Sequence, residues 1–122
     1  MRHLDQFDVL ANLRNGRSVE QLLAAGQDAD GRIVRFLVIH LEREGQWAVT
    51  LHEVADVGTA QYLDIYSFPS VAPDPDDAQS ASFASIEAAL EYARRALSAD
   101  MRRFVNSGMA ESEYRDTYHP QW

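Results

Sequence analysis

The feature that most constrains the fold is a series of three strand-length runs within residues 32–70. Each run is rich in β-branched and aromatic residues, which favour strands, and short polar breaks that contain glycine separate them. Runs joined in this way are typical of antiparallel hairpins. The sequence therefore predicts a three-stranded antiparallel meander, or a larger sheet that contains it. The runs are residues 33–41, 47–54 and 62–68.

Helical patterns flank the predicted sheet on both sides. Residues 5–14 carry apolar side chains at helical spacing, and residues 18–21 match a capping box that predicts a second short helix before Gly26. The strongest pattern is in residues 85–106, where Ser85 is a suitable N-cap and an apolar stripe recurs at steps of three and four. The stripe consists of Ile86, Leu90, Ala93, Leu97, Met101 and Phe104.

These patterns predict a single two-layer α+β domain, in which the meander packs on the long C-terminal helix. A chain of 122 residues is long enough to bury a core without disulfides or metals. The expected parts are a segment with short N-terminal helices (1–26), the meander (32–70), the long helix (85–106) and an aromatic tail (109–122).

A register in which Glu42 faces Trp47 would give the sheet one aliphatic face and one aromatic face. The aliphatic face suits the long helix. The aromatic face is too apolar to remain in water, so we expect the N-terminal helices, a second copy of the chain or a ligand to cover it. The candidate ligand- or partner-binding residues are Phe36, Trp47, Tyr66 and Phe68 on this face, and Tyr114, Tyr118 and Trp122 in the tail.

One polar group on the aromatic face suggests chemistry. Glu53 would lie opposite Asp64 beside His40, and two close carboxylates can share a proton, so that one acts as a general acid or base. The alternative is that both carboxylates are ionised and hydrated, because like charges directly opposite are unfavourable. His40 and His52 fall on opposite faces, so we predict no metal site. No nucleophile, phosphate-binding or dinucleotide motif is present, and we expect no cofactor.

Charge and composition limit the kinds of partner and the cell compartment that we expect. The chain carries 11 basic and 19 acidic residues, a net charge of −8, which disfavours binding to nucleic acid. It contains no cysteine, and its longest apolar run, residues 36–39, is too short to span a bilayer. Charged residues close to Met1 argue against a signal peptide. We therefore expect a cytoplasmic protein with no membrane association.

Three function classes remain open. The favoured one is a non-enzymatic interaction or regulatory protein that binds a protein partner or itself as a homodimer, because the chain is acidic and carries no catalytic motif. An inhibitor- or immunity-type protein that binds a basic target is one version. The second is a small-molecule-binding domain with a cavity on the aromatic face. The third is a small enzyme that uses Glu53 or Asp64 with His40 as acid and base.

Overall fold

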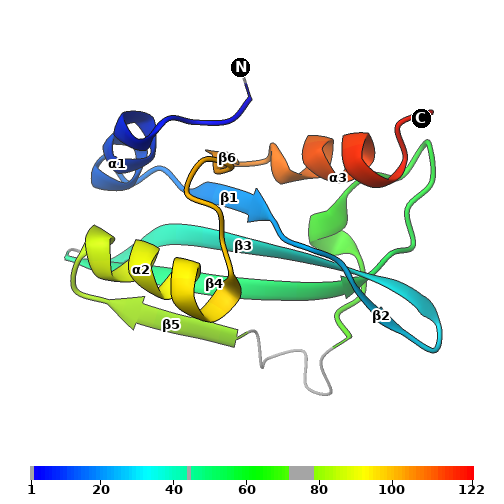
Figure 1. Ribbon diagram of the computed structural model, residues 1–122, viewed down its shortest axis with the longest axis horizontal. Coiled ribbons are helices and arrows are strands. Elements are labelled where there is room, and N and C mark those ends of the chain that lie inside the picture. Colours follow the sequence, from blue (N-terminus) through cyan, green and yellow to red (C-terminus); the bar gives the residue numbers. More distant parts are fainter. Residues whose placement is uncertain (1, 44, 72–78) are drawn as a thin grey trace.

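A computed structural model describes residues 2–43, 45–71 and 79–122, and these form an α+β fold (Figure 1). The described part contains three α-helices, one short 3-10 helix and a six-stranded antiparallel sheet, so the predicted α+β class with an antiparallel sheet is confirmed. The elements are α1 (Gln6–Arg14), β1 (Val19–Leu22), β2 (Gly26–Asp28), β3 (Gly31–Arg43), β4 (Gln46–Ala55), η1 (Ile65–Ser67), β5 (Gln79–Phe83), α2 (Ile86–Leu97), β6 (Val105–Asn106) and α3 (Ala110–Tyr118).

The long hairpin of β3 and β4 is the centre of the sheet, as the first two runs predict. The strand order is β5-β4-β3-β1-β6, and β2 pairs with the beginning of β3. The predicted register is wrong by one residue, because Leu41 pairs with Trp47 and the register shifts between Leu41 and Arg43. Since side chains alternate, this one-residue difference exchanges the two faces of β4 relative to β3. His52 pairs with Phe36 and so lies on the same face as His40.

The third predicted strand, residues 62–68, is wrong. Its centre is the 3-10 helix η1, whose first turn is capped by Asp64 because that carboxylate accepts a hydrogen bond from the Tyr66 N–H. The neighbour of β4 is instead β5, in which Ser80 pairs with Thr50 and Phe83 with Trp47. The strand β5 alternates small polar residues with apolar ones, a pattern too weak to predict a strand from sequence.

The predicted second N-terminal helix is also wrong. Residues 19–22 form β1, which pairs with β3 on one side and with β6 on the other. A helix of this length is unstable on its own, whereas pairing with β3 buries Val19 and satisfies the backbone polar groups. Tertiary pairing therefore overrides the capping-box signal.

The predicted long helix, residues 85–106, is too long, and the sheet does not pack on such a helix. Ser85 caps α2 as expected, but the helix ends at Leu97, because Ser98 adopts a left-handed conformation with φ 58°. Phe104 is fully buried and Val105 begins β6. The apolar stripe therefore reaches the core partly through a loop.

Two cores lie on opposite faces of the sheet. Helices α1 and α2 cover one face, and Figure 1 shows α2 lying along β4 and β5. Helix α3 and η1 cover the other, so the aromatic tail itself closes much of the face that was expected to need a cover. The first core contains Val9, Leu13, Val19, Leu23, Leu37, Ile39, Val49, Leu51, Ile86, Ala89, Ala93, Ala99 and Phe104. The second core contains Val34, Phe36, Val54, Ile65, Phe68, Val105, Ala110 and Tyr114.

Candidate functional site

The most densely bonded polar group is the carboxylate of Asp56, which follows the last residue of β4. Its side chain is 9% exposed and accepts hydrogen bonds from residues that are far apart in the sequence. Because four donors converge on one carboxylate, it links the end of β4 to helix α3. The donors are Tyr114 Oη at 2.5 Å, His119 Nε2 at 3.1 Å, an Arg32 guanidinium nitrogen at 3.1 Å and the Gly58 N–H at 3.2 Å.

Aromatic rings pack around this carboxylate. Trp122 stacks on His119 with ring centres 3.8 Å apart, and the Arg32 guanidinium lies 4.4 Å from the centre of the Tyr118 ring. Gly58 provides the space for the Tyr114 hydroxyl, since a Cβ there would lie 2.1 Å from Tyr114 Oη. The tail aromatics therefore serve the docking of the tail onto the sheet.

The electrostatics of this group favour a fixed charge. Burial raises the pKa of Asp56, but hydrogen bonds from Tyr114, His119 and Gly58 outweigh burial and hold that pKa below its usual 3.8. Burial and the neighbouring Asp56 charge raise the pKa of the Tyr114 hydroxyl well above its usual 10.0. Asp56 is therefore an anion and Tyr114 a neutral donor across the physiological range, which suits a structural ion better than a proton carrier.

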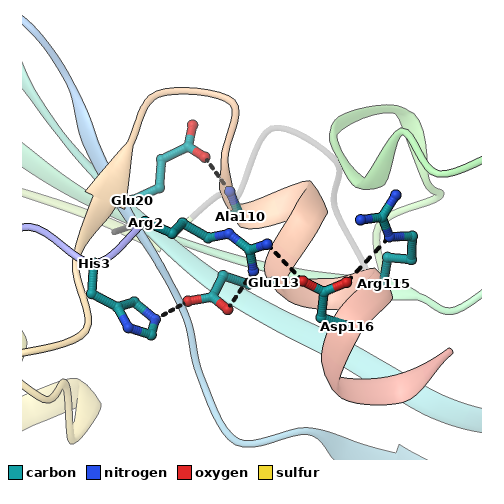
Figure 2. A network of polar contacts seen from close by, with 7 residues as sticks. All are labelled: Arg2, His3, Glu20, Ala110, Glu113, Arg115 and Asp116. Atoms are coloured by element: carbon teal, nitrogen blue, oxygen red, sulfur yellow. Dashed lines mark hydrogen bonds and ion pairs between the residues drawn. The ribbon is translucent and has the colours of Figure 1, made fainter. Parts of the chain in front are cut away.

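A second buried carboxylate, Glu20 of β1, lies at the beginning of α3 (Figure 2). It is 4% exposed and accepts hydrogen bonds from Tyr66 Oη at 2.5 Å and from the Ala110 N–H at 3.3 Å. The N-cap residue of α3, Met109, makes no side-chain cap. Glu20, which belongs to strand β1, therefore supplies the negative charge that the N-terminus of a helix favours.

The third carboxylate, Glu113, belongs to α3 and holds the N-terminal segment. Arg2 donates to Glu113 at 3.1 Å and to Asp116 at 2.6 Å, and His3 Nε2 also contacts Glu113 (Figure 2). Glu113 is 7% exposed, so this contact fixes residues before α1 against α3. Together Glu20, Asp56 and Glu113 anchor α3, and below we call these three residues the α3 anchor.

The predicted acid–base group is not brought together. Glu53 lies on the α1–α2 side of the sheet, where Arg35 of β3 donates to it at 3.1 Å, while His40 lies on the opposite side. Asp64 caps η1. His52 shares a face with His40 but stacks on Phe36 instead, and burial lowers its pKa despite the negative charge of Glu20.

The four predicted ligand-binding aromatics of the sheet lie on both of its faces. Trp47 is on one face, and Phe36, Phe68 and Tyr66 are on the other, where the Phe36 and Tyr66 rings pack with centres 5.5 Å apart. Trp47 lies against α1 and donates its indole N–H to the Leu13 carbonyl at 3.0 Å. Phe36 and Phe68 are 1% and 4% exposed in the second core, and Tyr66 is half-exposed beside Glu20. These four residues therefore do not line one shared cavity.

Sequence reasoning missed the α3 anchor because its signals are weak. Glu20 is a charged residue within an apolar stretch, which is the one sign that it needs a buried partner. Asp56 follows a strand and Glu113 sits in a polar helix, and both positions are typical of exposed carboxylates. Only the position of α3 shows that they are enclosed.

The described residues hold neither a metal-ion cluster nor a membrane-spanning helix. No group of three or more histidine, aspartate or glutamate side chains in residues 2–43, 45–71 and 79–122 could hold a metal ion. Within the same residues, no helix is long and apolar enough to cross a membrane. No protein-family model, curated protein or solved structure matches the chain.

The close contact between Gly58 and Tyr114 gives a first prediction. Gly58→Ala should lower the free energy of unfolding by about 2 kcal/mol, because the new methyl group displaces the Tyr114 hydroxyl from Asp56. Gly26→Ala is the matched control, since its Cβ would meet only ordinary contacts at 3.6 Å or more. Urea unfolding of both variants measures the effect. Equal stability of the two variants would contradict the described packing.

The pH dependence of Asp56 gives a second prediction. Its folded pKa is below 3.8, so its contribution to stability is complete above that value and is lost as the pH falls through the folded pKa. Asp56→Asn should therefore cost about 2 kcal/mol near neutral pH and progressively less below about pH 4. Urea unfolding of wild type and variant across this range measures the difference. A gap that stays constant down to strongly acidic pH would show that the Asp56 charge is not stabilising.

Proposed function

We propose that this chain is a non-enzymatic interaction protein of the cytoplasm that binds a basic protein partner, in the manner of an inhibitor or immunity protein. The binding surface would be the groove between α1 and α2. Two adjoining clefts of about 540 and 270 Å³ form this groove and share Gln6 and Met101 as lining residues. Its apolar lining residues are Leu4, Leu10, Leu90 and Met101.

The observation that carries this proposal is the exposure of Phe7 beside the groove. Phe7 is 85% exposed, the most exposed of the large apolar side chains in the described part of the chain. It lies one helical turn before Leu10 on α1, so an occupant of the groove can also cover its ring. Aromatic side chains next to apolar clefts are typical anchors of protein interfaces.

Charge supports a basic partner. The net charge of −8 attracts positively charged proteins and speeds their encounter. Asp5 and Glu87 line the groove, and neither forms an ion pair with another described residue. Glu91 lies at the same groove but is already paired with Arg94 at 2.6 Å. The cleft beside Asp5 also carries Arg102, and the Asp5 carboxylate already caps α1. Glu87 is therefore the main contact that the groove offers to a lysine or arginine side chain.

The buried polar groups support a role without catalysis. The three carboxylates of the α3 anchor accept hydrogen bonds from other residues of the chain. The predicted acid–base residues His40, Glu53 and Asp64 are not brought together. A small-molecule site receives less support, because the predicted aromatic residues do not line one shared cavity.

Peptide selection tests the proposal. The immobilised full chain is panned with a random peptide library displayed on phage, and a selected peptide is then titrated against wild type and variants. We expect selected peptides to combine apolar with basic residues, and Phe7→Ser to weaken their binding about tenfold or more. Phe7→Ser should change the free energy of unfolding by only about 0.5 kcal/mol, because the ring is exposed.

The matched control is Val57→Ser, which also removes an exposed apolar side chain but does not line the groove. It should leave peptide binding unchanged. The proposal is wrong if selection yields no binding peptide, or if Phe7→Ser and Val57→Ser bind the selected peptide equally.

A further inference from the structure

The outer edge of β5 has no partner strand in the described part of the chain. The strand is the last in the order β5-β4-β3-β1-β6, and its five residues pair only with β4. Figure 1 shows β5 along one margin of the sheet with α2 beside it. Its outward N–H and C=O groups are therefore a template for another strand.

This edge also lacks the usual protection against pairing. Proteins commonly protect edge strands with charged residues, prolines or bulges, and Gln79–Phe83 contains no charge or proline and pairs with β4 without a register shift. Ala81 and Phe83 point to the α2 side, while Ser80 and Ser82 bond to Thr50 and Glu42 on the other side. The strand is thus held in an extended, regular form.

Helix α2 continues this uncharged surface. Ser85, Ala88, Tyr92 and Ala96 recur at steps of three and four and so lie along one flank of α2. This flank faces the β5 side, because the Tyr92 and Phe83 rings pack with centres 5.1 Å apart. Glu87, Glu91 and Arg94 line or border the opposite flank, toward α1. Arg95 lies on the outer side of α2 next to Ala88, where it pairs with Glu91 at 2.6 Å.

We propose that two copies of this chain associate through β5, paired antiparallel across a two-fold axis, with the uncharged flanks of their α2 helices side by side. A two-fold contact brings the same surface of each copy together, and an edge strand paired antiparallel with itself meets that requirement. Two chains that each carry a net charge of −8 repel one another, so a close contact requires a surface without charge. The β5 edge and the flank of Tyr92 and Ala96 provide one, and the neighbouring Arg95 is already paired with Glu91. Alanines on this flank allow the helices to approach closely.

This dimer differs from the one that the sequence suggested. The aromatic sheet face no longer needs a second copy, because α3 and η1 enclose Phe36 and Phe68. The β5 contact also leaves the α1–α2 groove open, because the groove lies on the other flank of α2. Self-association and partner binding thus use separate surfaces.

Light scattering with charge-exchange variants tests the dimer. The double variant Ala88→Glu/Ala96→Glu places four like charges at the contact, and Ala88→Lys/Ala96→Lys does the same with opposite sign. Ala88 and Ala96 are exposed, and a glutamate at position 88 completes a capping box with Ser85, so the first variant should fold normally. The control Ala11→Glu/Ala29→Glu makes the same charge change at exposed positions elsewhere.

Wild type and control should have twice the chain mass of 13.8 kDa, and each charged α2 variant should have the chain mass alone. An equimolar mixture of the glutamate and lysine variants should recover the doubled mass, because opposite charges then meet across the axis. Amide exchange in Gln79–Phe83 should slow as wild type is concentrated. A wild type that stays monomeric overturns the proposal, and so does a glutamate variant that remains dimeric. Phe7→Ser should remain dimeric, which separates this test from the test of the groove.

Discussion

An ionised carboxylate that is almost removed from water is the constraint on which the second half of this fold depends. Asp56 at the end of β4 is enclosed only because Tyr114, His119 and Arg32 donate to it. An uncompensated buried charge costs several kcal/mol, so the sheet end and α3 cannot separate without exposing or neutralising it. Gly58 leaves the space that this contact requires. The position of α3, and with it the second core, follows from these contacts.

The parts of the fold that the sequence predicts are those with strong local patterns. The β3–β4 hairpin has long β-branched runs, and Ser85 marks the beginning of α2. The parts that failed depend on single residues or on tertiary pairing. A register shift after Leu41 exchanged the faces of β4, and β1 is too short to show its own period. The end of α2 at Ser98 has no glycine or proline signal.

The candidate site shows the same division. The aromatic residues of the tail stand out in the sequence as candidates for a contact, but their acceptors do not, since Asp56 and Glu113 have no pattern that separates them from exposed carboxylates. The predicted third strand placed Asp64 opposite Glu53, and the register error placed His40 on the same face. In the structure Asp64 caps η1 and Glu53 pairs with Arg35. The two proposed contact surfaces lie on opposite flanks of α2, one lined by Glu87 and Arg94 and the other by Tyr92 and alanines.

Amide hydrogen exchange on wild type and Tyr114→Phe tests most directly whether buried carboxylates hold α3. Removing one hydroxyl leaves the Asp56 carboxylate short of a donor while the ring still fills the second core. If buried carboxylates hold α3, exchange should be faster in Ala110–Tyr118 and at the end of β4, and unchanged in α1, α2 and β5. Unchanged exchange in α3, or equal acceleration throughout the sheet, would contradict this role of the carboxylates.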